Sequence, residues 1–218
     1  MAKLVNKPKN YSEAELIQLF SLIRLPYGET PLMKEWTDAT TTLTVVEQVT
    51  FDRILQKARR SLEGWQEEEL KMKFLAFVLE LGGIDDHEEY FTYFERTISA
   101  TVEGHFLKTK TDLMLAKGIL DMPQSPYFHF QEWKKQKDPT GDPVPQLIEA
   151  FLIAQEVNKN NKPLYGCTIT GKFWDFFVME HKTYCISASY DCTNPEDLLK
   201  IIAMLRKFVE ILESRLLE

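Results

Sequence analysis

The chain has 218 residues, of which 44% are hydrophobic and 27% are charged, and its formal net charge is −7. A chain of this size and composition can bury a substantial core as an ordinary globular protein, so it does not need disulfides to fold. The negative charge argues against a protein that coats nucleic acid non-specifically, because such binding requires many phosphates to be neutralised. It does not exclude an enzyme that holds phosphate through metal ions bound to carboxylates.

The cysteines and the apolar runs bear on the cellular location. Cys167, Cys185 and Cys192 contain no CxxC pair and leave an odd thiol, which fits a reducing compartment. The apolar stretches are far shorter than the roughly 18 residues of a membrane span, and Met1–Asn10 is not followed by an apolar run. We therefore expect a cytoplasmic protein without a membrane partner.

The N-terminal half of the sequence predicts helices. Ser12 followed by Glu15 is a capping box, and the amphipathic helix that it begins is expected to end before Pro26. A turn and two further helices are predicted over residues 26–31, 44–63 and 65–81. We expect residues 1–64 to form a helical N-terminal extension of a core that covers residues 65–218.

From about residue 94 the sequence has the composition and periodicity of strands. Strands are predicted near residues 95–103, 107–116, 127–133, 164–169, 173–179 and 183–188. A turn is predicted at Met122–Pro126, a loop at 134–145, and helices over 146–158 and 196–216. This order predicts an α/β protein with a mixed central sheet flanked by helices.

Charged residues follow an apolar run in the third predicted strand. Because side chains alternate along a strand, Phe128, Phe130, Glu132 and Lys134 share one face. Charges at buried strand positions need a partner or a metal ion. An ion pair between Glu132 and Lys134 is the simpler interpretation.

Asp112 interrupts the preceding strand, where aspartate is unfavourable. It could mark a turn or a bulge. Two carboxylates from adjacent strands, Asp112 and Glu132, also suit Mg²⁺, which takes few carboxylates and keeps several waters. A lysine beside such an ion can orient the attacking water and stabilise charge on a phosphate.

Asp112 followed by Glu132-Trp133-Lys134 resembles the signature of the PD-(D/E)XK nucleases, the restriction-endonuclease-like superfamily. The resemblance covers about residues 65–190, although Thr111 stands where the signature has proline. The layout is similar to small uncharacterised bacterial members that have a helical N-terminal extension.

The resemblance implies a nuclease that cleaves nucleic acid, with DNA expected ahead of RNA, and that needs Mg²⁺ or Mn²⁺. It implies that Asp112, Glu132 and the backbone carbonyl of Trp133 hold the metal and that Lys134 assists the attacking water. Glu67 on the upstream helix would complete the ligand set, although Glu68 and Glu69 compete for this role.

Further residues have roles that the resemblance leaves open. Gln146 would contact the substrate or a metal-bound water, or would be only a polar residue in the first turn of a helix. Lysines that flank the motif would contact the phosphate backbone, or would be only solvated: Lys108, Lys110, Lys135 and Lys137. A homodimer is possible because many nucleases cut two strands by pairing. The alternative is a non-catalytic binding or assembly module on the same fold, and a third possibility is an unrelated α/β protein with a structural Glu132–Lys134 pair.

Overall fold

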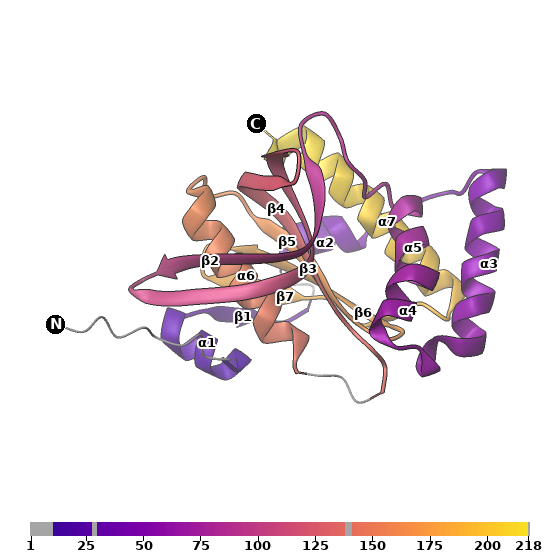
Figure 1. Cartoon of the computed structure of the whole chain (residues 1–218), viewed down its shortest axis with the longest axis horizontal. Coiled ribbons are helices and arrows are strands. Elements are labelled where there is room, and N and C mark those ends of the chain that lie inside the picture. The colour runs from indigo at the N-terminus through magenta and orange to yellow at the C-terminus, as the bar shows by residue number, and fades with distance from the viewer. Residues whose placement is uncertain (1–10, 28–29, 138–140, 218) are drawn as a thin grey trace.

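The computed structural model describes residues 11–27, 30–137 and 141–217, and its centre is an eight-stranded mixed sheet (Figure 1). The strand order is β1-β7-β6-β5-β4-β3-β2, and β8 pairs with β6 beside this path. The strands are β1 (Ile23–Leu25), β2 (Phe91–Val102), β3 (His105–Ile119), β4 (Met122–Lys134), β5 (Leu164–Thr170), β6 (Phe173–Glu180), β7 (Thr183–Ile186) and β8 (Tyr190–Asp191). The predicted fold class, a mixed sheet flanked by helices, is confirmed.

The helices cover both faces of this sheet. They are α1 (Glu13–Phe20), α2 (Pro31–Thr37), α3 (Val45–Ser61), α4 (Glu67–Leu70), α5 (Ala76–Leu81), α6 (Pro143–Asn158) and α7 (Pro195–Ile211), with one π-helical segment (Lys71–Leu75) between α4 and α5 and another (Leu212–Leu216) after α7. Among the described residues, no helix combines the length and the apolar character that crossing a membrane requires.

Strands β2, β3 and β4 form an antiparallel meander, and β4 then pairs in parallel with β5. Parallel neighbours need a crossover connection, and α6 supplies it. The strands β5, β6 and β7 are again antiparallel, and β1 joins β7 in parallel at the edge. Residues 135–142 therefore connect the carboxyl end of β4 to the start of α6.

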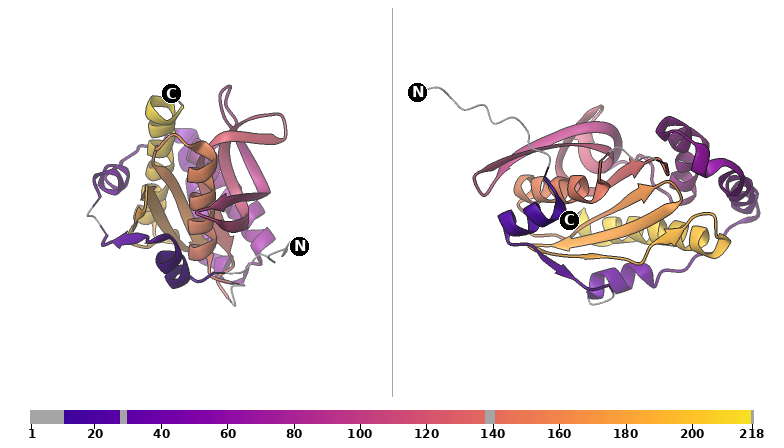
Figure 2. Two further views of the ribbon diagram at one scale, coloured as in Figure 1. Left: turned by 90° about the vertical axis from the view of Figure 1, so that its left-hand side faces the viewer. Right: turned by 90° about the horizontal axis from the view of Figure 1, so that it is seen from below.

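Helices lie on both faces of the sheet (Figure 2), and a layer of buried hydrophobic side chains joins them to it on each face. One layer joins α1 and α6 to a face that carries Met114 and Phe130. The other joins α2, α3, α5 and α7 to the face that carries Leu113, Tyr165 and Phe176. The alternation of adjacent residues between the two layers, as at Leu113 and Met114, is the period-two pattern of a strand buried on both sides.

The first 64 residues contain the predicted helices and also two elements that we did not predict. Strand β1 joins the sheet, and helix α2 begins inside the segment for which we expected a turn, whose residues 28 and 29 lie outside the described ones. The Thr30 hydroxyl accepts a hydrogen bond from the Met33 backbone N–H and caps this helix. On it, Trp36 is fully buried and donates its indole N–H to the Met204 carbonyl at 2.6 Å. This region thus supplies part of the core that covers the sheet.

The turn between β3 and β4 lies at Leu120-Asp121, so the prediction of a turn at Met122–Pro126 is wrong. Leu120 adopts the left-handed φ of 55°, and the two prolines that suggested a turn lie inside β4. The prolines are accommodated where the ladder is irregular, because the register between β3 and β4 shifts on both sides of Ala116. The predicted loop at 134–145 is shorter, since β4 extends to Lys134 and α6 starts at Pro143, and residues 138–140 lie outside the described ones.

Candidate functional site

Asp112 and Glu132 lie across from each other on β3 and β4. Leu113 pairs with Gln131, and the backbone N–H of Trp133, two residues further along β4, donates a hydrogen bond to Asp112 Oδ2 at 2.7 Å. Residues directly opposite in an antiparallel pair project to the same face. Asp112 is 8% exposed and Glu132 is 4% exposed, so two carboxylates from adjacent strands are buried side by side.

Lys134 projects from the same face of β4 as Glu132, two residues further along. Its ammonium lies 2.6 Å from Glu132 Oε1, and both side chains are buried. The structure therefore contains the ion pair that was the simpler interpretation of the sequence. It also brings Asp112, Glu132 and Lys134 into one group, which the metal hypothesis requires.

Burial makes the ionised forms of the two carboxyl groups, Asp112 and Glu132, energetically unfavourable. Burial, together with the negative charge of Asp112, raises the pKa of Glu132 to about 8, against the opposing effect of the Lys134 ammonium. Burial also raises the pKa of Asp112, although the hydrogen bond from the Trp133 N–H and the nearby lysines oppose it. A cation placed between the two carboxylates would relieve this cost.

Lys71, which the sequence analysis did not select, binds the same group. Its Nζ lies 2.6 Å from Glu95, 3.1 Å from Glu67 and 3.4 Å from both Glu68 and Asp112. Burial disfavours the charged ammonium, but the hydrogen bond to Glu95 and the charges of Asp112 and Glu67 outweigh it, and the pKa of Lys71 is raised. The sequence carried one signal for it: Lys71 follows Glu67 by one helical turn.

Glu95, also not selected, is held in an unusual backbone conformation. Its φ is 56°, in the left-handed region that residues other than glycine rarely adopt. The residues that flank Glu95 in β2 pair with those that flank Asp112 in β3, so the two acids face each other along the ladder. Hydrogen bonds from Lys110 and Lys71 lower the pKa of Glu95 to about 2. Its position depends on a backbone conformation that no local sequence pattern predicts.

The three candidate glutamates of the upstream helix have different surroundings. Glu67, 33% exposed, shares the Lys71 ammonium with Asp112. Glu68 also approaches Lys71 but is 81% exposed, and Glu69 binds Lys73 and the backbone N–H of Gln66 instead. Of the three, Glu67, the residue favoured by the sequence, is the one whose negative charge helps to raise the pKa of both Asp112 and Glu132.

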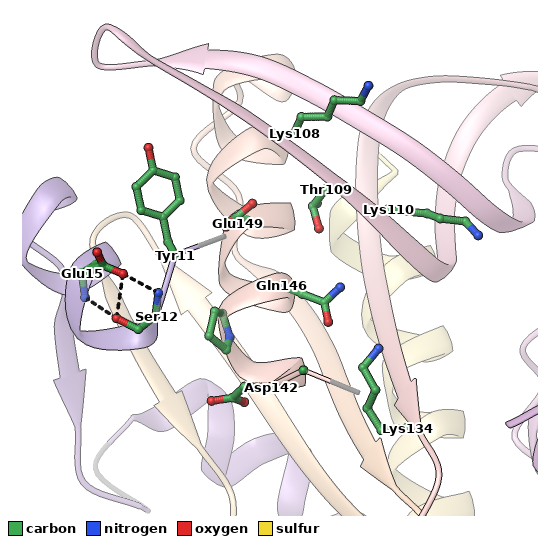
Figure 3. Close-up of a pocket in the computed structure, with 12 residues that line it drawn as sticks. Tyr11, Ser12, Glu15, Lys108, Thr109, Lys110, Lys134, Asp142, Gln146 and Glu149 are labelled. Carbon is green, nitrogen blue, oxygen red and sulfur yellow. Dashed lines mark hydrogen bonds between the residues drawn. The ribbon is translucent and has the colours of Figure 1, made fainter. Parts of the chain in front are cut away.

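Gln146 and Lys134 line one cavity of about 760 Å³ between α6, β3 and the start of α1. Figure 3 shows Lys134 extending from β4 and Gln146 from the first turns of α6 toward the same hollow, with Thr109 beyond them. Glu149 lies on the α6 wall of this cavity, and its burial raises its pKa to about 7. The cavity therefore opens beside the Lys134 end of the buried group.

A second cavity, of about 560 Å³, opens at the Asp112 end. Its wall includes Asp112, Trp133, Lys71 and Glu95, and its apolar part includes Phe94, which is half exposed. The buried group is thus reached from both sides.

The flanking lysines do not share one role in this structure. Lys110 is engaged with Glu95, and the Lys135 ammonium reaches the side-chain oxygen of Gln66 at 3.5 Å. Lys108 is exposed on the rim of the larger cavity, and Lys137 is exposed after the end of β4. Their predicted contact with nucleic acid stays a prediction.

The donor set suits one class of metal ion. Across residues 11–27, 30–137 and 141–217, no group of three or more His, Cys, Asp or Glu side chains is arranged to hold a metal. Structural zinc sites need four such ligands, whereas Mg²⁺ is held by one or two carboxylates and several waters. Asp112 and Glu132 supply the two carboxylates that this second type would need, and metal binding by them and by the Trp133 carbonyl stays a prediction.

No protein-family model matches this chain, and a search of curated proteins also finds no match. The PD-(D/E)XK assignment therefore remains a resemblance that rests on the quoted residues.

Proposed function

We propose that this protein is a metal-dependent phosphodiesterase that cleaves nucleic acid, with DNA as the expected substrate. One observation carries the proposal: Asp112 lies opposite Glu132, both are buried, and the Lys134 ammonium is 2.6 Å from Glu132. Buried like charges on adjacent strands destabilise a fold, and their presence is explained if they bind a cation.

In this proposal Asp112 and Glu132 hold Mg²⁺ or Mn²⁺, and Glu67 contributes through a bound water. Such an ion, when bound, acidifies a water molecule and stabilises negative charge on a phosphate. The backbone N–H of Trp133 fixes the orientation of Asp112 by its hydrogen bond to Oδ2. A hydrogen bond to a metal-binding carboxylate keeps that carboxylate in position for its ion.

Lys134 and Gln146 would act on the substrate side of the group. The Lys134 side chain lines the larger cavity, where it can orient the attacking water and stabilise charge on the phosphate. The Gln146 amide faces the same cavity and can donate a hydrogen bond to a phosphate oxygen. The cavity itself is large enough for a nucleotide-sized ligand.

A non-catalytic binding or assembly module is the second candidate, and a specific observation favours it. The ammonium groups of Lys71 and Lys134 already lie against Asp112 and Glu132, so the carboxylates have partners without any metal. A buried network of this kind can serve structure alone.

A cytoplasmic location is part of the proposal, supported by three buried cysteines that are all free thiols. The proposal includes a homodimer only if the protein cuts both strands of a duplex, since two paired subunits can cut one strand each.

The test is cleavage of single- and double-stranded DNA and RNA in the presence of Mg²⁺ or Mn²⁺. We expect activity that EDTA abolishes, and that Asp112→Asn and Glu132→Gln each remove. Asp121→Asn, an exposed acid at the turn of the same hairpin, is the matched control and should keep full activity. Undiminished cleavage by Glu132→Gln would refute the assignment, and inactivity of the wild-type protein on every substrate would favour the binding module.

A further inference from the structure

Lys71 has four carboxylates around its ammonium, whereas Lys73, in the same helical segment, has one. Its ammonium contacts Glu67, Glu68, Glu95 and Asp112 at 2.6–3.4 Å, and its side chain is only 12% exposed. Lys73, two residues later, is 47% exposed and has a single ion pair, with Glu69. A surface lysine gains little from such pairs, whereas Lys71 balances several charges in a partly buried place.

Two irregular stretches of backbone meet at this lysine. The π-helical segment Lys71–Leu75 begins at it, and its shortest carboxylate contact is to Glu95, which has the left-handed φ of 56°. Both features are rare and costly, and both cluster at functional sites in other proteins. They lie in different elements, a helix and a strand, and together they bring Lys71 and Glu95 against Asp112.

The Lys71 ammonium lies next to the carboxylate of Asp112, one of the two proposed metal ligands, and supplies a positive charge beside it. It lies 3.4 Å from Asp112 Oδ1, while the other oxygen, Oδ2, is bound by the Trp133 N–H. Oδ1 is therefore the oxygen of Asp112 that faces Lys71, while Oδ2 is partly occupied by a backbone hydrogen bond. Mg²⁺ binds carboxylate oxygens at about 2.0–2.1 Å, so an ion on Oδ1 would come into direct conflict with the ammonium.

We propose that Lys71 is an internal counter-cation that occupies the cation position of this carboxylate group, and that a divalent metal ion binds by displacing its ammonium. This inference rests on the proposed function and adds a step to it. In the metal-free protein, the Lys71 ammonium balances the charge of the carboxylates, which stabilises the fold, and it prevents weakly binding cations from occupying the site. Metal binding releases the lysine toward the second cavity, whose wall it already forms.

The first test follows the lysine itself in the wild-type protein. An amine-acetylating reagent modifies exposed, uncharged amines, so Lys71 should react slowly without metal. Saturating Mn²⁺ should increase its modification, measured by mass spectrometry, by roughly tenfold as the ammonium leaves its carboxylates. Lys73 on the same helix is the internal control and should not respond. In Asp112→Asn, Mn²⁺ should leave Lys71 unchanged.

The second test measures the affinity for Mn²⁺ by calorimetry. Lys71→Met should bind Mn²⁺ on the order of tenfold more tightly than the wild-type protein, because a competing unit charge is gone. Lys73→Met should match the wild type. If Lys71→Met does not fold without metal, the acetylation experiment on the wild type still decides the question.

The outcomes separate the two proposals. If Mn²⁺ binds the wild type and Lys71 stays protected, the displacement is refuted while the metal site survives. If Mn²⁺ binds only Lys71→Met, the lysine blocks the site without being displaced, which overturns the inference and also the metal-dependent function of the wild-type protein. If neither protein binds Mn²⁺, the inference and the metal-dependent function both fall.

Discussion

Asp112 Oδ2 accepts the backbone N–H of Trp133 at 2.7 Å, so a side chain of β3 continues the hydrogen bonding of β4 beyond the paired ladder. The hydrogen bond gives Asp112 a structural role beside its proposed catalytic one. The two roles can be separated by substitution.

Asp112→Ala should destabilise the protein more than Asp112→Asn. Alanine leaves the buried Trp133 N–H without an acceptor, which costs about 1–3 kcal/mol, whereas asparagine retains a carbonyl oxygen. Urea denaturation of both variants measures the difference. Equal stability of the two variants would show that the N–H finds another partner.

At a pH above 8, where the buried Glu132 carboxyl is ionised, Lys134→Met should cost up to about 3–5 kcal/mol, because it leaves this carboxylate without its ion pair. Adding Glu132→Gln removes the uncompensated charge, so the double variant should be more stable than Lys134→Met alone. A double-mutant cycle by chemical denaturation measures this coupling. Additive losses would mean that the two side chains do not interact in solution.

Glu149 should make the protein less stable as the pH rises. Burial raises its pKa to about 7 in the folded protein, above its ordinary value of 4.5, so the folded state binds the proton more tightly than the unfolded chain does. Its contribution is complete below 4.5 and is lost as the pH rises through about 7. Between about pH 5 and pH 8 the free energy of unfolding should fall by up to about 3 kcal/mol more in the wild type than in Glu149→Gln. Parallel pH profiles would contradict this.

Trp36 should be essential for stability although it lies in the N-terminal region. Trp36→Ala should cost about 3–5 kcal/mol, and Trp36→Phe about 1 kcal/mol, through the lost hydrogen bond to the Met204 carbonyl. Val46→Ala, at an exposed apolar position on α3, is the control and should change little. Wild-type stability of Trp36→Ala would show that this region folds independently of the sheet.

Local patterns in the sequence were enough to predict most elements and the fold class. The Ser12–Glu15 capping box is present as predicted, and the strand and helix periodicities correspond to β2 to β7, α6 and α7. These features depend on interactions between residues close in sequence, which a single chain displays directly. Strand β1 was missed because three residues are too few for a periodic signal, and it exists only through its pairing with β7.

The meeting of Asp112 and Glu132 in the candidate site depends on the pairing register between β3 and β4. Next to the turn, Ile119 pairs with Met122. If this register continued along the two strands without interruption, Asp112 would lie opposite His129. The shifts on both sides of Ala116 bring Asp112 opposite Glu132 instead. A shift by an odd number of residues also exchanges the two faces of a strand.

By itself, the sequence determined which residue types were available: two strand carboxylates, a lysine two positions after one of them, and a helix with acidic residues upstream. Only the tertiary structure decided that they meet, and that Lys71 and Glu95 join them. The physical reason is that helix and strand periodicity are local, whereas strand register, a left-handed strand residue and a buried ion pair are stabilised by contacts between distant segments.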